Sequence, residues 1–196
     1  MVCNIGHSNE NVLAAMRRQM EKSTFGYRLH FETEASETLA RRLAGKMPEG
    51  LDRVFFVSGG SEAVESCLKV ALQYHSANGE TSRRRFISRR RSWHGNTLGA
   101  LSGSGFLARR TPYEGALIDS SLLSPVNIYR PPPNVAPGEV AEFCATELEQ
   151  EIERLGAENI AAFIFEPIVG AAGGVVPAPP GYAARIRDIC DRSGVL

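Results

Sequence analysis

Short apolar segments alternate with amphipathic segments over most of the chain, and this alternation limits the choice of fold more than any other feature. Residues 160–165 form a nearly continuous apolar run, which is typical of a strand buried on both faces in a parallel sheet. Residues 86–88 indicate a second strand, and residues 53–57 indicate a third. Strands that alternate with helices predict an α/β fold with a mostly parallel sheet and helices on both of its faces.

Six segments place apolar residues three or four positions apart, as one face of a helix requires. These segments begin at Ser8 or Asn9, at Thr33, at Ser61, at Asn96 or Thr97, at Glu139 and at Gly181. Between the first two, Phe25, Tyr27 and Phe31 alternate with polar residues, and we interpret that part as an extended segment or a loop. Residues 102–138 are rich in Gly, Pro and Ser, and three successive prolines at 131–133 exclude a regular helix there.

The order of the predicted elements divides the chain into two parts. Residues 1–50 carry the first two helices and are expected to form an N-terminal helical segment that leads into a larger domain. Residues 51–196 carry the predicted strands and are expected to form part of that domain. The pattern before Leu196 is one that leads into another buried strand, so we expect the domain to be incomplete in this chain.

Composition excludes several classes of protein. The chain has 22 basic and 22 acidic residues and 43% hydrophobic residues, values that are ordinary for a soluble globular protein. The four cysteines are widely spaced and form no CxxC pair, which argues against a disulfide scaffold and against a zinc site. The N-terminus lacks the pattern of a signal peptide, and no apolar run has the length of a membrane span. We expect a cytoplasmic protein.

The segment Ser58-Gly59-Gly60-Ser61-Glu62-Ala63 is the first candidate site. It follows a predicted strand and opens a predicted helix, where glycines let main-chain N–H groups approach an anion and the helix dipole favours negative charge. The alternative is that Ser61 only caps the helix. A Walker loop is excluded because no GxxxxGK[ST] pattern is present.

Two further candidates follow other predicted strands. Trp93-His94-Gly95 comes after the strand at 86–88, and its indole could stack on an aromatic ligand, although a core Trp beside a surface His is the alternative. Glu166 follows the strand at 160–165 and either orients a ligand or pairs with an Arg of a neighbouring loop. Because ligands of open α/β sheets bind at the carboxyl ends of strands, these segments are expected to meet.

Two runs of arginine raise the possibility of nucleic-acid binding. Arg83-Arg84-Arg85 and Arg89-Arg90-Arg91 flank the predicted strand at 86–88. Arginines do contact phosphates, but a chain of zero net charge lacks the basic balance of most such proteins. A solvated or ion-paired surface is the favoured interpretation.

Three motifs in series resemble the class III pyridoxal-phosphate (PLP) aminotransferases. They are residues 53–66, which contain Ser58-Gly59-Gly60-Ser61, then residues 93–100, which open with Trp93-His94-Gly95, and then Phe165-Glu166-Pro167-Ile168 with Gly173-Gly174. Their order and approximate spacing match over nearly the whole chain. The resemblance implies a fold type I PLP-dependent transferase, of which this chain is an incomplete large domain.

The resemblance also implies roles for individual residues. Gly60 and Ser61 would hold the phosphate of PLP, with Gly59 in the turn. Trp93 would stack on the pyridine ring. His94 and Gly95 would complete that wall, and Glu166 would lie close to the ring or to the bound substrate.

The family's catalytic groups are expected to lie outside this chain. A carboxylate that pairs with the pyridine nitrogen and a lysine that forms a Schiff base with the cofactor both come later in such enzymes. No catalytic residue is therefore assigned, and the chain itself is expected to be inactive.

The resemblance further implies a homodimer and the transfer of an amino group from an amino acid or amine to a keto acid. A non-catalytic relic, a dimerisation partner of a full-length relative, and a decarboxylase or aminomutase stay open as alternatives.

Overall fold

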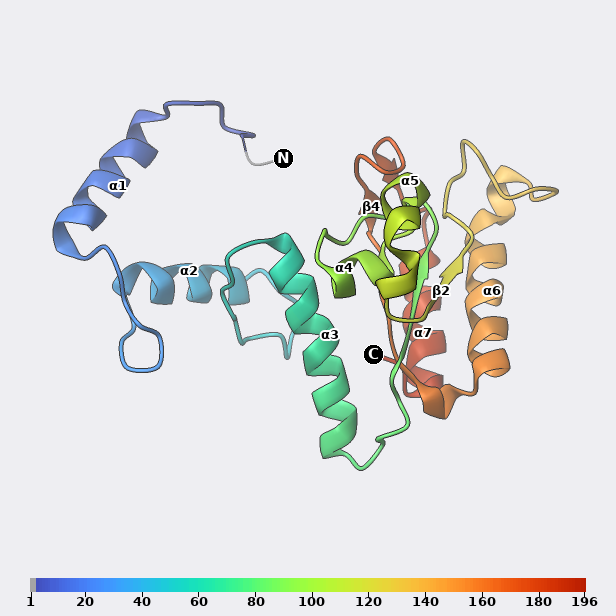
Figure 1. The fold of residues 1–196 in the computed structure, drawn as a ribbon. Helices are drawn as coiled ribbons and strands as arrows, with labels where there is room; N and C mark the ends of the chain where they lie inside the picture. Colours follow the sequence, from blue (N-terminus) through green and yellow to red (C-terminus); the bar gives the residue numbers. More distant parts are fainter. Residues whose placement is uncertain (1–2) are drawn as a thin grey trace. The chain divides into compact units, whose positions relative to one another are not determined.

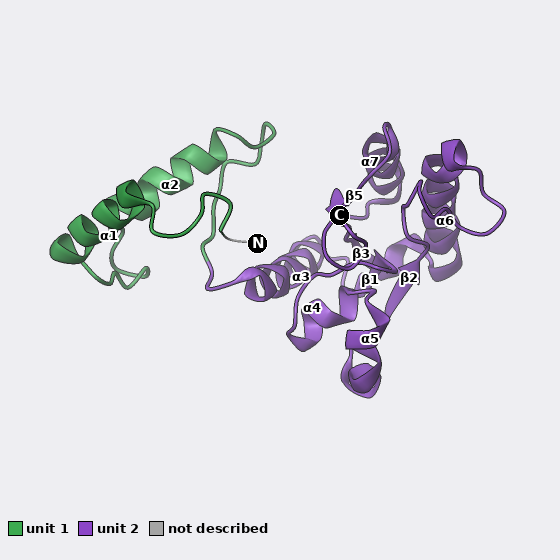
Figure 2. Cartoon of the chain, turned by 90° about the horizontal axis from the view of Figure 1, so that it is seen from above, with its two compact units in different colours: residues 1–56 green, residues 57–196 purple. Residues whose placement is uncertain are grey.

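A computed structural model describes residues 3–196. The chain forms two compact units, residues 1–56 and residues 57–196 (Figure 2). The assignment of the first residues to a helical segment that precedes a larger domain stays a prediction. Among the described residues, no helix is both long enough and apolar enough to cross a membrane.

Helices and strands alternate along the second unit, as the sequence predicts (Figure 1). The first unit contains two helices, α1 (Glu10–Lys22) and α2 (Glu34–Ala44). The elements of the second unit are α3 (Gly60–Ala77), β1 (Arg85–Arg89), α4 (Leu98–Gly103), α5 (Leu107–Arg110), the 3-10 turn η1 (Thr111–Ala116), β2 (Ser120–Leu123), η2 (Pro137–Glu139), α6 (Val140–Leu155), η3 (Ala157–Asn159), β3 (Ile160–Phe163), β4 (Ile168–Val169), β5 (Val176–Pro177) and α7 (Tyr182–Ser193).

Three parallel strands make the main sheet, in the order β2-β1-β3. Phe86 lies opposite Ser120 on one side and opposite Ala162 on the other. The short strands β4 and β5 form a separate antiparallel hairpin. The prediction of a parallel α/β sheet is confirmed.

Alternate residues of the strands pack against different helices. Ile87 and Ile160 belong to a buried cluster with residues of α6 and α7, whereas Phe86 and Ala161 pack with Leu68 of α3. Successive side chains of a strand point to opposite faces, so the sheet lies between α3 and α4 on one face and α6 and α7 on the other (Figures 1 and 2).

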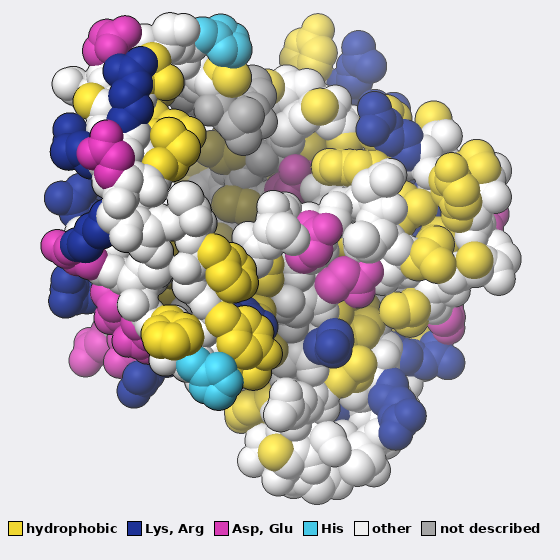
Figure 3. Space-filling model, turned by 60° about the vertical axis from the view of Figure 1, so that its left-hand side comes forward, with side chains coloured by type: hydrophobic (Ala, Val, Ile, Leu, Met, Phe, Trp, Pro, Cys, Tyr) yellow, Lys and Arg dark blue, Asp and Glu magenta, His cyan; other side chains and the backbone are white. Residues whose placement is uncertain are grey.

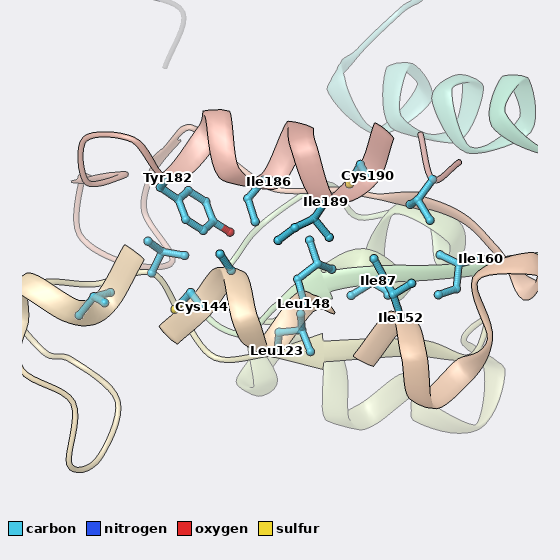
Figure 4. Close-up of a cluster of buried hydrophobic side chains, with 14 residues drawn as sticks. Ile87, Leu123, Cys144, Leu148, Ile152, Ile160, Tyr182, Ile186, Ile189 and Cys190 are labelled. Atoms are coloured by element: carbon cyan, nitrogen blue, oxygen red, sulfur yellow. The ribbon is translucent and has the colours of Figure 1, made fainter. Parts of the chain in front are cut away.

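The larger cluster lies between α6, α7 and the sheet. Figure 4 shows Leu148 of α6 and Ile189 of α7 directed toward Ile87 of β1. Leu148 and Ile87 are both fully buried. Burial of apolar side chains at roughly 25 cal/mol per Å² is the main term that stabilises such a core.

The predicted helix boundaries agree with local capping. Asn9 Oδ1 accepts from the Asn11 N–H at 3.1 Å, and Thr33 Oγ1 accepts from the Ser36 N–H at 3.2 Å. Helix α7 begins and ends at glycines, Gly181 and Gly194, which have φ angles of 79° and 65°. Glycine adopts this left-handed conformation at no steric cost, so the two residues fix the ends of α7.

Two strand predictions differ from the structure. Residues 53–57 form no strand, and Phe55 and Phe56 are 60% and 40% exposed. A strand needs a neighbour to take up its main-chain hydrogen bonds, and the described sheet β2-β1-β3 does not include this segment. Conversely, β2 lies within the Gly-, Pro- and Ser-rich stretch, where Ser120 and Ser121 conceal the strand pattern.

Leu196 lies alongside β3. Its N–H donates to the Ala161 carbonyl at 3.1 Å, and its carbonyl accepts from the Phe163 N–H at 2.9 Å. In parallel strands, the N–H and the carbonyl of one residue bond to two residues of the neighbouring strand that are two positions apart. Leu196 therefore pairs with β3 in the parallel direction.

Candidate cofactor-binding site

The N-terminus of α3 is open to solvent and has no side-chain cap. Gly59 is the residue that caps the helix, and no side chain accepts from the first N–H groups. A Cβ atom placed on Gly60 would meet no atom within 4 Å. Uncapped N–H groups and the helix dipole together suit an anion.

Ser61 does not cap its own helix. It is the second residue of α3, and its Oγ accepts from the main-chain N–H of Asn96 at 2.9 Å. The alternative in which Ser61 serves only as a helix cap is therefore wrong. Among the described residues the hydroxyl proton of Ser61 has no acceptor, so it can donate to a ligand.

Gly95 brings the Trp93-His94-Gly95 segment against α3. Its φ angle is +150°, and a Cβ atom there would lie 2.7 Å from Ala100 Cβ and 2.8 Å from Ser61 Oγ. Any other residue would push the two segments apart. Two motifs that are more than thirty residues apart in the sequence thus meet through a glycine contact and the Asn96–Ser61 hydrogen bond.

Glu166 holds the same segment from the other side. Its Oε2 accepts from the Trp93 N–H at 3.0 Å, and its Oε1 accepts from the Gly170 N–H at 3.4 Å. Within the described chain Glu166 forms no ion pair with an arginine, so the carboxylate fixes main chain instead. Trp93 and Glu166 follow β1 and β3, at the carboxyl edge of the sheet where ligands bind in open α/β folds.

The Trp93 indole is partly exposed, and one arginine lies over it. The guanidinium carbon of Arg109 is 5.1 Å from the centroid of the Trp93 ring, a cation–π distance. Trp93 is therefore neither fully buried nor fully exposed, and its stacking on a ligand stays a prediction.

His94 is buried next to Trp93. It is 9% exposed, its main-chain N–H donates to Ser104 Oγ at 2.9 Å, and its Nε2 has no hydrogen-bond partner among the described residues. Burial lowers the pKa of His94 below the usual 6.5, and the Glu166 carboxylate opposes that shift. The alternative of a surface histidine is wrong, and a neutral imidazole stands in the wall of the site.

Sequence reasoning missed Glu65. Its Oε1 accepts from the N–H groups of Gly99 and Ala100 at 2.9 and 3.2 Å, so α3 supplies the N-terminal cap of α4. Glu65 comes one helical turn after Ser61 and therefore shares its face of α3. The four-residue spacing from Ser61 is the feature of the sequence that could have identified Glu65.

The one lysine of the second unit does not line the cradle. Lys22 and Lys46 belong to residues 1–56, and Lys69 is an exposed residue of α3. Lys69 is eight residues after Ser61, a rise of about 12 Å along the helix. The second unit therefore offers an anion cradle and an aromatic wall, and its own lysine lies away from the cradle.

The arginine runs are partly internal. Arg83 Nη1 donates to the carbonyls of Ala157 and Ser193 at 2.6 and 3.3 Å, and the buried Arg89 donates to Tyr182 Oη at 2.6 Å. On the face shown in Figure 3, basic side chains are scattered among acidic and apolar ones. These arrangements favour the interpretation of an ion-paired and structural role over nucleic-acid binding.

The family model of class III aminotransferases matches residues 1–196. The chain belongs to this family. An uncharacterised aminotransferase of Bacillus subtilis, YodT, is 39% identical over 196 residues, which cover 100% of this chain and 44% of the relative. An omega-aminotransferase of Caulobacter vibrioides is 35% identical, over 98% of this chain and 44% of the relative.

Solved transaminases share the fold. An (S)-enantioselective omega-transaminase from Thermomicrobium roseum superposes with a TM-score of 0.89 at 37% identity, covering 99% of this chain and 43% of the other. An amine transaminase from an uncultivated Pseudomonas species, solved in its PLP-bound form, gives a TM-score of 0.86 at 38% identity, covering 99% and 44%. The resemblance to class III aminotransferases and the expected fold are confirmed.

The chain of this class III aminotransferase spans less than half the length of the relatives that it matches. It corresponds to a part of an α/β PLP-dependent transaminase, with a parallel sheet and helices on both faces.

Proposed function

We propose that this chain supplies the phosphate cradle and the ring-binding wall of a PLP site, in an enzyme that moves an amino group from an amino acid or amine to a keto acid. The observation that carries the proposal is the joining of the uncapped α3 terminus to the Trp93 segment through Gly95 and the Asn96–Ser61 hydrogen bond. An anion cradle beside an aromatic side chain suits a phosphorylated aromatic cofactor.

Each residue has a separate task in this proposal. The N–H groups of Gly60 and Ser61, with the Ser61 hydroxyl, bind the phosphate. Gly59 lies in the turn before them, where the Glu62 carboxylate leaves no space for a Cβ atom. Trp93 stacks on the ring. His94 stays neutral in the wall, because burial lowers its pKa, and Gly95 keeps the wall close to the cradle.

Glu166 acts as a positioning residue for Trp93, because its carboxylate accepts from the Trp93 N–H. PLP, when bound, withdraws electrons from the amino substrate and so permits the proton transfers of transamination. This chain is proposed to bind without turnover, since Lys69, the one lysine of residues 57–196, does not line the site and no residue here is assigned to a covalent step.

The assembly and the compartment are proposals of the same kind. A cytoplasmic homodimer suits the family. Phe25, Tyr27 and Phe31 are 79%, 48% and 66% exposed in the first unit, and large exposed aromatic side chains are typical of interfaces. We propose that this segment borders the active site of a partner subunit.

The test uses the fluorescence of Trp93, the one tryptophan of the chain. Pyridoxamine 5′-phosphate is the probe, because it has no aldehyde and cannot react with surface lysines. We expect saturable quenching, which pyridoxamine without the phosphate does not produce.

Ser61→Ala should weaken probe binding by roughly tenfold, the effect of about 1.4 kcal/mol. Ser66→Ala is the matched control, because Ser66 Oγ bonds only to Glu62 of its own helix in the described structure. Equal affinity of the two variants, or equal quenching by both probes, would refute the phosphate cradle.

A further inference from the structure

A groove on the second unit lies outside the Ser61 cradle. It has a volume of about 410 Å³ and runs between the loop after β2 and the β4–β5 hairpin. Its walls are Arg91, residues 127–130 and residues 173–177. This volume lies within the range of small-molecule sites, roughly 300–1,000 Å³.

The groove is positively charged. Arg91 and Arg130 line it, both are exposed, and neither forms an ion pair with another described residue. None of the residues that line the groove is acidic. Glu166 lines an adjoining cavity, which shares Arg91, Asn127, Gly173 and Val176 with the groove. The Arg130 guanidinium lies 5.9 Å from the centroid of the Tyr129 ring, a contact that leaves its charge without an acidic partner. Two such guanidinium groups on one groove favour an anion.

Asn127 supplies an unused donor. The residue is 8% exposed, and its Oδ1 accepts from the N–H groups of Tyr129 and Arg130, both at 2.9 Å. These bonds orient the amide and leave its Nδ2 without an acceptor among the described residues. A buried amide with a free N–H₂ group in the wall of a groove is a donor available to a ligand.

The backbone is strained at two points of the same groove. Arg91 and Val175 have φ angles of 58° and 61°, a left-handed conformation that a β-branched residue such as Val rarely adopts. Such positions cost about 1–3 kcal/mol each and gather at ligand sites. Arg91 is held there by its N–H, which donates to the Gly105 carbonyl at 2.9 Å.

We propose that this groove binds a small carboxylate with an apolar chain. The carboxylate lies between the guanidinium groups of Arg91 and Arg130 and accepts from Asn127 Nδ2. A planar guanidinium pairs with a carboxylate through two parallel hydrogen bonds. The apolar chain lies on Ile128 and Val176, which supply the uncharged part of the wall. The proposal does not rest on PLP binding at Ser61.

The test is a titration of the ¹⁵N-labelled full chain with hexanoate, followed by two-dimensional NMR. We expect saturable shifts confined to residues 91, 127–130 and 173–177, with a dissociation constant of about 1–10 mM. 1-Hexanol has the same chain without the charge and should give no saturable shift. The absence of saturation by hexanoate at about 50 mM, or shifts elsewhere, would overturn the proposal.

Variants separate the charge from the shape of the site. Arg130→Gln should weaken hexanoate binding by roughly fivefold, and Arg130→Lys should weaken it less. Arg91→Gln tests the second guanidinium and should also weaken hexanoate binding. Arg18→Gln is the matched control, because Arg18 is an exposed arginine of α1. Equal affinity of the Arg130→Gln and Arg18→Gln chains would refute the assignment. Tighter binding of inorganic phosphate than of hexanoate would also overturn it.

Discussion

At the scale of single residues, the candidate site depends on contacts that leave no space for a side chain. Gly95 is the clearest case, because a Cβ atom there would lie within 3 Å of both Ala100 and Ser61. The contact joins the aromatic wall to the anion cradle. A change at this glycine should therefore affect stability and ligand binding together.

Gly95→Ala should lower the free energy of unfolding by about 1–3 kcal/mol, because the added methyl group forces the two segments apart. The same variant should lose the quenching of Trp93 by pyridoxamine 5′-phosphate. Gly115→Ala is the control, since a Cβ there meets no atom within 4 Å, and it should change stability by less than about 0.5 kcal/mol. Urea denaturation of both variants measures the difference, and equal stability would contradict the contact.

His94 gives the site a dependence on pH. Burial lowers its pKa below 6.5, with Glu166 opposing the shift. As the pH falls below 6.5, this histidine takes up a proton more readily in the unfolded chain than in the folded chain. Protonation therefore favours the unfolded chain, and the folded state loses stability as the pH falls.

We expect the melting temperature to fall between about pH 7.5 and 5.5, and to fall less in His94→Leu. The exposed His30, in His30→Gln, is the control. Circular dichroism melts at both pH values test this expectation. The same decrease in His94→Leu as in the unchanged chain would show that His94 is not responsible.

At the scale of elements, α6 carries much of the core of the second unit. Leu148 is fully buried between α7 and the sheet, whereas Phe143 of the same helix is 38% exposed. The two side chains therefore separate the effect of burial from that of the helix itself.

Leu148→Ala should reduce the free energy of unfolding by about 2–5 kcal/mol, because it removes buried methyl groups and leaves a cavity. Phe143→Ala should cost clearly less. Denaturation of the two variants under the same conditions gives the comparison. A smaller loss for Leu148→Ala would mean that α6 does not pack as described.

At the scale of the whole molecule, the core belongs to one unit. The buried apolar side chains run from Leu68 to Val195, and helices α1 and α2 bury none. A cooperative transition requires a buried core. The two compact units should therefore differ in stability.

Residues 57–196 expressed alone should keep a cooperative thermal transition, and residues 1–56 alone should show none. Circular dichroism melts of the two pieces and of the full chain measure this. A cooperative melt of residues 1–56 would contradict the expectation, and so would the loss of any transition in residues 57–196.

The sequence by itself determined most of the helices and two strands of the parallel sheet, because apolar periodicity, caps and glycines act over a few residues. Gly181 and Gly194, for example, fix the start and the end of α7 through their own backbone conformation. The resemblance of three motifs to known enzymes indicated the family. The three motifs also indicate which segments of the chain form the candidate site. The strands at 86–88 and 160–165 were predicted for the same reason.

Only the tertiary structure decided which atoms meet. The bond from Asn96 to Ser61 and the two bonds to Glu166 join segments that are far apart in the chain. The missed strand β2 and the absent strand at 53–57 have the same cause, since a strand exists through its neighbours rather than through its own pattern. Long-range packing, which short-range periodicity does not record, fixes both the sheet and the site.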